Sequence, residues 1–270
     1  MPAVHFARET LLNSRSAACL WKHPLQAGRL VFGALRNFML PLEERLLPAG
    51  RVRCPVCDWR GRRFRNYLSA DEVLAHCICP GCGSFDRHRH LVLGVRAELA
   101  ERPGWTPQVM VGFSLSTAMR FVLEHEGLTR CYRSDFAVEE ERYSPDFVAD
   151  LRQAPLRTGS VDWLFCSHVL EHIPELDGAI DELWRVLRPG GAAWIQVSLE
   201  PTIAHSRPLN GNDAGDRPRA WQFAPDFGCR LERPGWQVTE EIARERLSRQ
   251  DRKRYGIHPV ERFWVVRKAT

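Results

Sequence analysis

Four of the nine cysteines are arranged in two pairs that could bind one metal ion. Cys54 and Cys57 form one C-x-x-C pair, and Cys79 and Cys82 form the other, about twenty residues later, which is the spacing of ribbon-type zinc sites. Each pair places two thiolates on one tight turn, and two such turns complete a tetrahedral shell. Because sulfur fills all four positions, we predict a structural zinc ion; the alternative is four unrelated buried thiols.

Further candidate residues end or follow four predicted strand segments, 109–111, 129–136, 147–149 and 161–166. If these segments are parallel strands, their carboxyl ends open at one edge of a sheet, where ligands bind at the point of reversed strand order. We therefore predict one binding site at that edge, formed by the residues that end or follow the strands: Gly112, Phe113, Ser114, Asp135, Asp150, Leu151, Ser167 and His168.

The run from His168 to His172 also matches H-x-x-E-H, a zinc-peptidase motif. Peptidases carry this motif within a helix, whereas here it directly follows an apolar segment and Pro174 comes soon after. We therefore expect no peptidase. We predict that His168 and Glu171 are catalytic, with His168 as a general base, and that His172 packs locally. The alternative is that all three hold a divalent cation.

Alternating strand and helix patterns predict the fold class. Apolar runs and helical periodicities alternate from residue 108 to residue 197, as in a Rossmann-like, doubly wound and mostly parallel sheet, and residues 263–266 predict an antiparallel last strand. We divide the chain into a helical segment (1–50), a zinc-ribbon module (51–92) and the α/β domain (93–270). We expect the polar loop at 200–222 to cover an acceptor site.

The sequence resembles the class I methyltransferases that depend on S-adenosylmethionine (SAM), of the type 11-like group. The motifs that carry the resemblance are Phe147–Leu151, Pro155–Pro174 and Leu183–Gly191. A narrower resemblance is to bacterial members with an N-terminal four-cysteine module. It rests on Cys79–Arg89 and on Arg254–Gly256.

The resemblance implies roles for the residues at the strand ends. Asp135 would accept hydrogen bonds from the two ribose hydroxyls of SAM, Asp150 would accept from the adenine amino group, and the Leu151 backbone would meet the ring. The chain departs from the family's Gly-x-Gly at Gly112-Phe113-Ser114, where one glycine remains. Ser114, Ser116 or Thr117 could cap the helix that follows.

Charge is distributed unevenly along the chain. Residues 1–100 contain 15 Lys and Arg against 8 Asp and Glu, and the remainder contains 23 against 25. The arginines of Arg51–Arg65, interleaved with aromatic residues, could bind RNA, although a solvated face is the plainer interpretation. The basic amphipathic helix expected before Pro41 could contact a membrane, but we expect it to pack on its own domain.

These observations favour a SAM-dependent methyltransferase that acts on a small-molecule or sugar-like acceptor. The apolar runs are too short for membrane insertion and the N-terminus lacks a secretory pattern, so we expect a cytoplasmic protein. One alternative is an RNA or protein methyltransferase that binds its substrate through the basic module. The other is a non-catalytic Rossmann-like scaffold with a degraded SAM loop.

Overall fold

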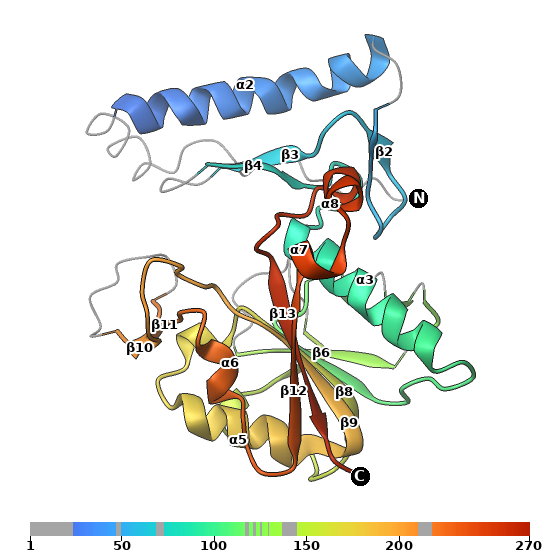
Figure 1. Cartoon of the computed structure of the whole chain (residues 1–270), viewed down its shortest axis with the longest axis vertical. Coiled ribbons are helices and arrows are strands. Elements are labelled where there is room, and N and C mark those ends of the chain that lie inside the picture. The colour runs from blue at the N-terminus through green and yellow to red at the C-terminus, as the bar shows by residue number, and fades with distance from the viewer. Residues whose placement is uncertain are drawn as a thin grey trace. The chain divides into compact units, whose positions relative to one another are not determined.

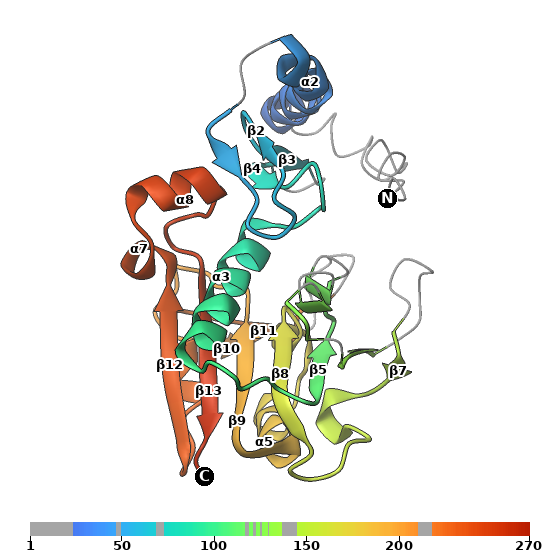
Figure 2. The same cartoon turned by 90° about the vertical axis from the view of Figure 1, so that its right-hand side faces the viewer.

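The computed structural model describes residues 24–46, 50–68, 73–116, 119–120, 123–124, 126–128, 130–136, 145–209 and 218–270 (Figures 1 and 2). The chain folds into two compact units. The first unit comprises Met1–Arg89 and Arg249–His258, and the second comprises His90–Ser248 and Pro259–Thr270. The sequence placed 93–270 in one domain, whereas residues 249–258 belong to the first unit.

The first unit combines helices with two small hairpins. Its elements are α2 (Pro24–Leu46), β1 (Val52–Arg53), β2 (Arg60–Gly61), β3 (Arg65–Leu68), β4 (Val73–Ile78), the start of α3 (Asp86–Glu101) and α8 (Arg249–Tyr255). Strand β1 pairs antiparallel with β2, and β3 pairs antiparallel with β4. The helix expected within residues 1–50 is present as α2, and the earlier part of that range lies outside the described residues.

Buried Asn66 on β3 ties α2 to the β3–β4 hairpin. Its amide nitrogen donates to Asn37 Oδ1 at 2.8 Å, its carbonyl accepts from Asn37 Nδ2 at 2.9 Å, and its side-chain oxygen accepts from the His76 amide at 3.0 Å. The side chain also donates to the Gly33 carbonyl at 3.3 Å. One side of α2 is thereby fixed against the hairpin.

A seven-stranded sheet forms the second unit, in the order β12-β13-β9-β8-β5-β6-β7. The strands are β5 (Met110–Phe113), β6 (Cys131–Asp135), β7 (Phe147–Val148), β8 (Val161–Ser167), β9 (Leu187–Gln196), β12 (Trp236–Ile242) and β13 (Arg262–Lys268). The strands from β5 to β9 are parallel, and β13 runs antiparallel to both of its neighbours. The predicted Rossmann-like sheet with an antiparallel last strand is confirmed.

Shorter elements connect and cover these strands. They are η2 (Leu151–Gln153), η3 (Leu170–His172), α5 (Leu176–Val186), β10 (Arg207–Pro208), β11 (Trp221–Gln222), α6 (Phe227–Arg230) and α7 (Ala243–Arg246). Strands β10 and β11 pair antiparallel, so the predicted 200–222 loop contains two short paired strands, one in its interior and one at its end.

Alternating side chains give the sheet two apolar faces. On β8, Leu164 and Cys166 belong to the core that includes Ile180 and Leu183 of α5. Trp163 and Phe165 point to the other face, where the Phe165 ring stacks on Trp194 and the Trp163 ring meets Trp194 edge-on. On that face Gly94 of α3 lies against Phe263, since a Cβ added there would be 2.5 Å from the ring. Both faces of the sheet are therefore covered, as its continuous apolar strands require.

Candidate active site

The carboxyl ends of the parallel strands bring the predicted ligand-binding residues to one edge of the sheet. Phe113 at the end of β5 pairs with Ser134 of β6 on one side and with Cys166 of β8 on the other. The chain passes from β5 outward through β6 and β7, then returns to β8 on the opposite flank of β5. This reversal defines the position at which doubly wound sheets bind ligands, between the turns that follow β5 and β8.

The turn after β5 has a backbone conformation that usually requires glycine. Ser114 has a φ of 52°, in the left-handed region, and its amide donates to the Ser134 carbonyl at 2.9 Å. Gly112 is needed for a different reason, because a Cβ there would be 2.5 Å from the Leu115 Cβ. Ser116 Oγ accepts from the Met119 amide at 3.2 Å, so Ser116 caps the start of the next helix. The missing second glycine therefore does not abolish the tight turn.

Asp135 and Asp150 lie at the ends of neighbouring strands. Both carboxylates are half-buried, and Asp135 Oδ1 accepts from the Phe136 amide at 2.8 Å. Asp150 caps η2 by accepting from the Arg152 amide at 2.9 Å, and it forms an ion pair with the Arg152 guanidinium at 2.6 Å. The Arg152 hydrogen bond lowers the pKa of Asp150, so this carboxylate is an ionised acceptor. A ligand at Asp150 would share it with Arg152, and the Leu151 side chain is buried in the core.

His168 and Glu171 form a side-chain pair directly beyond β8. His168 Nδ1 lies 3.0 Å from Glu171 Oε1, which also accepts from the Ser198 amide at 3.2 Å. Glu171 is only 2% exposed. Burial alone would raise the pKa of Glu171, but the hydrogen bond and charge of His168 lower it overall. Nδ1 is thus engaged, and Nε2 is the ring nitrogen left to exchange a proton with a substrate.

Hydrogen bonds to Gln196 of β9 fix the backbone of His168 at the end of β8. The His168 amide donates to the Gln196 carbonyl at 2.9 Å, and Ser167 Oγ donates to the Gln196 side chain at 3.1 Å. His168 has a φ of 55°, a backbone conformation that residues other than glycine adopt at a cost of about 1–2 kcal/mol. Strained backbone of this kind clusters at active sites and ligand-binding sites.

Residues 218–221 lie directly against the short η3 helix. The Ala220 amide donates to the Glu171 carbonyl at 2.8 Å, His172 Nδ1 lies 3.0 Å from the Pro218 carbonyl, and Trp221 Nε1 donates to the Pro174 carbonyl at 3.1 Å. His172 therefore contacts this loop rather than His168. Among the residues that the structure describes, His168, Glu171 and His172 do not form a metal-binding group.

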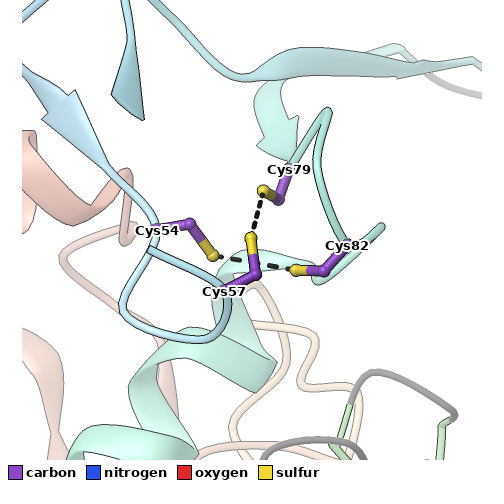
Figure 3. A group of neighbouring side chains, drawn as sticks. All are labelled: Cys54, Cys57, Cys79 and Cys82. Carbon is purple, nitrogen blue, oxygen red and sulfur yellow. Dashed lines mark hydrogen bonds between the residues drawn. The ribbon is translucent and has the colours of Figure 1, made fainter. Parts of the chain in front are cut away.

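The four cysteines of the first unit converge as the sequence predicted (Figure 3). All four Sγ atoms lie within 4.8 Å of one another, with 3.8 Å between Cys54 and Cys82 and 3.7 Å between Cys57 and Cys79. Sulfurs about 2.3 Å from a tetrahedral zinc ion are about 3.8 Å apart. The two distances fit this geometry and are far longer than a disulfide bond. Hydrogen bonds from the other three thiols lower the pKa of Cys54.

The two C-x-x-C turns have the same backbone hydrogen bonds. The Cys54 amide donates to the Trp59 carbonyl at 2.8 Å, and the Cys54 carbonyl accepts from the Asp58 amide at 3.0 Å. In the same way, the Cys79 amide donates to the Ser84 carbonyl and the Cys79 carbonyl accepts from the Gly83 amide, both at 2.9 Å. The residue after the second cysteine is left-handed, with φ of 60° at Asp58 and 71° at Gly83. The pairs are thus two copies of one ligand-presenting turn, in which Asp58 replaces glycine.

Arg89 connects the cysteine module to the C-terminal segment, a role that sequence analysis missed. Its guanidinium is completely buried and donates to the carbonyls of Tyr255 and Gly256, both at 2.7 Å. It also donates to the carbonyls of Cys77 and Ser84, at 3.0 and 2.6 Å. The joint presence of the Cys79–Arg89 and Arg254–Gly256 motifs was the available signal.

Part of the basic Arg51–Arg65 region is neutralised within the first unit. Arg63 is buried and hydrogen-bonds Glu43 at 3.1 and 3.2 Å. Arg53 and Arg60 both lie within ion-pair distance of Asp58. These arginines have local partners, which favours the plainer interpretation of a solvated, internally paired face.

Comparison with known proteins shows that part of the chain matches a described protein family. Residues 111–195 match the family described as "Methyltransferase domain". The chain is 30% identical over 94 residues to a biotin biosynthesis bifunctional protein, BioHC, of Cellvibrio japonicus, which covers 34% of this chain and 16% of that protein. It is 26% identical over 187 residues to a ubiquinone biosynthesis O-methyltransferase of Xanthomonas oryzae pv. oryzae, covering 68% of this chain and 70% of the relative.

A solved structure of a Burkholderia thailandensis 1,6-didemethyltoxoflavin-N1-methyltransferase is also similar. Its TM-score is 0.45 at 16% identity, and the match covers 68% of this chain and 79% of the other. The family match spans the strands from β5 to β9 together with α5, the part of the sheet whose edge holds Ser114, Asp135 and His168. Residues 111–195 are therefore a SAM-dependent methyltransferase domain.

Proposed function

We propose that this SAM-dependent methyltransferase domain methylates a hydroxyl group of a small-molecule acceptor, with His168 as the proton acceptor. The observation that carries the proposal is the His168–Glu171 pair beyond β8, beside the reversal of strand order and against residues 218–221. A hydroxyl must lose its proton when it is methylated, so it requires a base within reach. The Xanthomonas relative is an O-methyltransferase by name, which agrees with an oxygen acceptor.

The strand-end residues fit the cofactor in type and position. Asp135 and Asp150 supply carboxylate oxygens at consecutive strand ends, and Asp150 is held ionised by Arg152. We assign the ribose hydroxyls to Asp135, the adenine amino group to Asp150 with the Leu151 backbone beside the ring, and the remainder of the cofactor to Gly112, Phe113, Ser114 and Ser167. Bound SAM supplies an activated methyl group, so the protein mainly aligns the acceptor.

Glu171 acts on the reaction through His168. Its carboxylate holds Nδ1 of the ring, which orients Nε2 and stabilises the imidazolium that forms when a proton is taken up. Because Glu171 is almost fully buried, its charge is screened little by water. The residues of the 200–222 loop, which meet η3 at Glu171 and His172, would exclude water above this pair.

The four cysteines are proposed to hold one structural zinc ion. The donor set of four sulfurs and the tetrahedral sulfur spacing support zinc, and they leave no open position for catalysis. Zinc would stabilise the fold of the first unit rather than take part in methyl transfer.

The test is a pair of measurements on the full chain. Calorimetry with S-adenosylhomocysteine should show binding, which a non-catalytic scaffold with a degraded loop would lack. A screen of phenolic and sugar-like hydroxyl compounds with radiolabelled SAM should then identify an acceptor whose methylation requires His168. If the chain binds the cofactor but His168→Ala methylates the acceptor at the wild-type rate, the proposed role of His168 is wrong.

A further inference from the structure

Helix α2 exposes a continuous apolar surface. Eight of the thirteen exposed large hydrophobic side chains among the described residues lie on this helix: Leu25, Val31, Phe32, Leu35, Phe38, Met39, Leu42 and Leu46. At 3.6 residues per turn these eight positions occupy one unbroken arc of about 140° around the helix. Their exposure runs from 42% at Met39 to 86% at Leu25. We call this surface the α2 arc.

The opposite side of α2 is packed, so the arc cannot turn inward. Leu40 is 1% exposed, and a Cβ on Gly33 would be 2.7 Å from Leu68 Cδ2, because the helix lies close to β3. The Asn37–Asn66 hydrogen bonds fix the same side of the helix to the hairpin. Helix α2 is thus held by the first unit with its apolar arc facing away from the hairpin.

The size of the arc exceeds that of a typical exposed patch. If each fully exposed side chain offers roughly 150–200 Å², the exposed fractions give the arc on the order of 800–1,000 Å². The largest apolar patch on a typical monomer is about 300–600 Å², and larger ones mark binding to proteins or membranes.

Charge decides between these partners. The first unit contains 18 Lys and Arg against 8 Asp and Glu in the sequence, and the second contains 20 against 25. Arg29 and Arg36 lie at one border of the arc, Arg45 lies at the other, and the Arg36 guanidinium is 5.9 Å from the Phe32 ring centre. A second copy would bring two surfaces of the same positive charge together, and RNA would leave the six aliphatic side chains of the arc in water. An anionic lipid surface complements both the charge and the apolar arc.

We propose that the α2 arc binds the surface of a bilayer that contains anionic lipids. The apolar side chains would enter the boundary between headgroups and acyl chains, and the bordering arginines would contact the phosphates. One side of α2 remains packed on β3 and β4, so the helix would lie along the surface. No helix among the described residues is long and apolar enough to cross a membrane. This inference is independent of the proposed acceptor.

The test is co-sedimentation of the full chain with vesicles. Vesicles of phosphatidylcholine mixed with phosphatidylglycerol should bind the chain at least about tenfold more tightly than pure phosphatidylcholine vesicles, since each basic residue at the surface contributes about fivefold. The double variant Phe32→Ser/Phe38→Ser should lose at least about tenfold in binding. Phe136→Ser, which removes a 67% exposed phenylalanine from the second unit, is the matched control and should bind normally.

Two other occupants of the arc would overturn the proposal. If residues 1–23 or a second copy cover it, the wild-type chain will stay in the supernatant with anionic vesicles, and light scattering will report a monomer or a dimer, respectively. Equal sedimentation of the wild type and the double variant would also overturn it. All variants should retain the wild-type metal content and melting temperature, because the replaced side chains are exposed.

Discussion

Replacing Glu171 by glutamine tests whether the buried carboxylate works through His168. Glutamine keeps the size of the side chain and an oxygen that can still accept from the Ser198 amide and from His168 Nδ1. The negative charge is removed, and the buried Oε2, which has no hydrogen-bond partner among the described residues, becomes an amide NH2 group. Since Glu171 is 2% exposed, water cannot reach this position to stabilise the His168 imidazolium in place of the carboxylate.

The expected loss of turnover follows from the hydrogen bond between His168 and residue 171, whose acceptor becomes neutral in the variant. A hydrogen bond to a charged group contributes about 1.5–3 kcal/mol, and one between neutral groups contributes about 0.5–1.5 kcal/mol. The imidazolium formed in the transition state therefore loses about 1–2 kcal/mol of stabilisation. At 1.36 kcal/mol per tenfold, turnover of the Glu171→Gln variant should fall by about five- to thirtyfold.

The assay is initial-rate methyl transfer with saturating SAM, together with calorimetry for S-adenosylhomocysteine and a thermal melt. Cofactor affinity should stay within about twofold and turnover alone should fall, because the change affects proton transfer. Glu245→Gln, which neutralises an exposed carboxylate of the second unit, is the control. Unchanged turnover would refute the role of Glu171. A parallel loss of cofactor affinity and melting temperature would show that Glu171 only supports the fold.

Three further predictions concern the metal, the cofactor and pH. Elemental analysis should find about one zinc per chain, and wild-type protein without metal would contradict this. The Cys54→Ser variant should lose the metal and melt at a lower temperature, whereas the control Cys229→Ser, at an exposed cysteine, should do neither. Asp135→Ala should weaken S-adenosylhomocysteine binding by about tenfold in calorimetry, whereas Asp181→Ala on the surface should not; equal affinities would remove Asp135 from the site. Burial lowers the pKa of His90 from 6.5 to about 4, and the charge of Arg246 adds to this, so the folded chain binds this proton more weakly than the unfolded chain. Stability should therefore be complete above about pH 6.5 and fall by up to ~3 kcal/mol as the pH drops towards 4. His90→Phe should flatten this part of a urea-unfolding profile, and an unchanged profile would show that His90 is not its source.

Local sequence predicted the strands that are buried on both faces. Val161–Ser167 is almost continuously apolar, and it forms the central strand β8. The edge strand β12 (Trp236–Ile242) was missed, because only alternate side chains meet the core and its exposed positions carry Gln, Thr and Glu. An edge strand with this composition resembles a polar loop when no partner is known.

The candidate site was predictable in its residues but not in its contacts. The positions of Asp135, Asp150 and His168 followed from strand ends, which the chain order fixes. His168 pairs with Glu171 from a left-handed backbone conformation, which the residue types at these positions do not predict. The contact of His172 with Pro218 joins residues far apart in the sequence, so local patterns carry no information about it.

The hydrogen bonds of Arg89 determine when, during synthesis, the first unit can be completed. A ribosome delivers the four cysteines early, but it delivers Tyr255 and Gly256, whose carbonyls receive the Arg89 guanidinium, only after nearly all of the second unit has been made. Until then two of the four carbonyl acceptors of Arg89 are missing, and burying its guanidinium without them would be costly. The set of acceptors around Arg89 is therefore completed only after residues 90–256 have been synthesised.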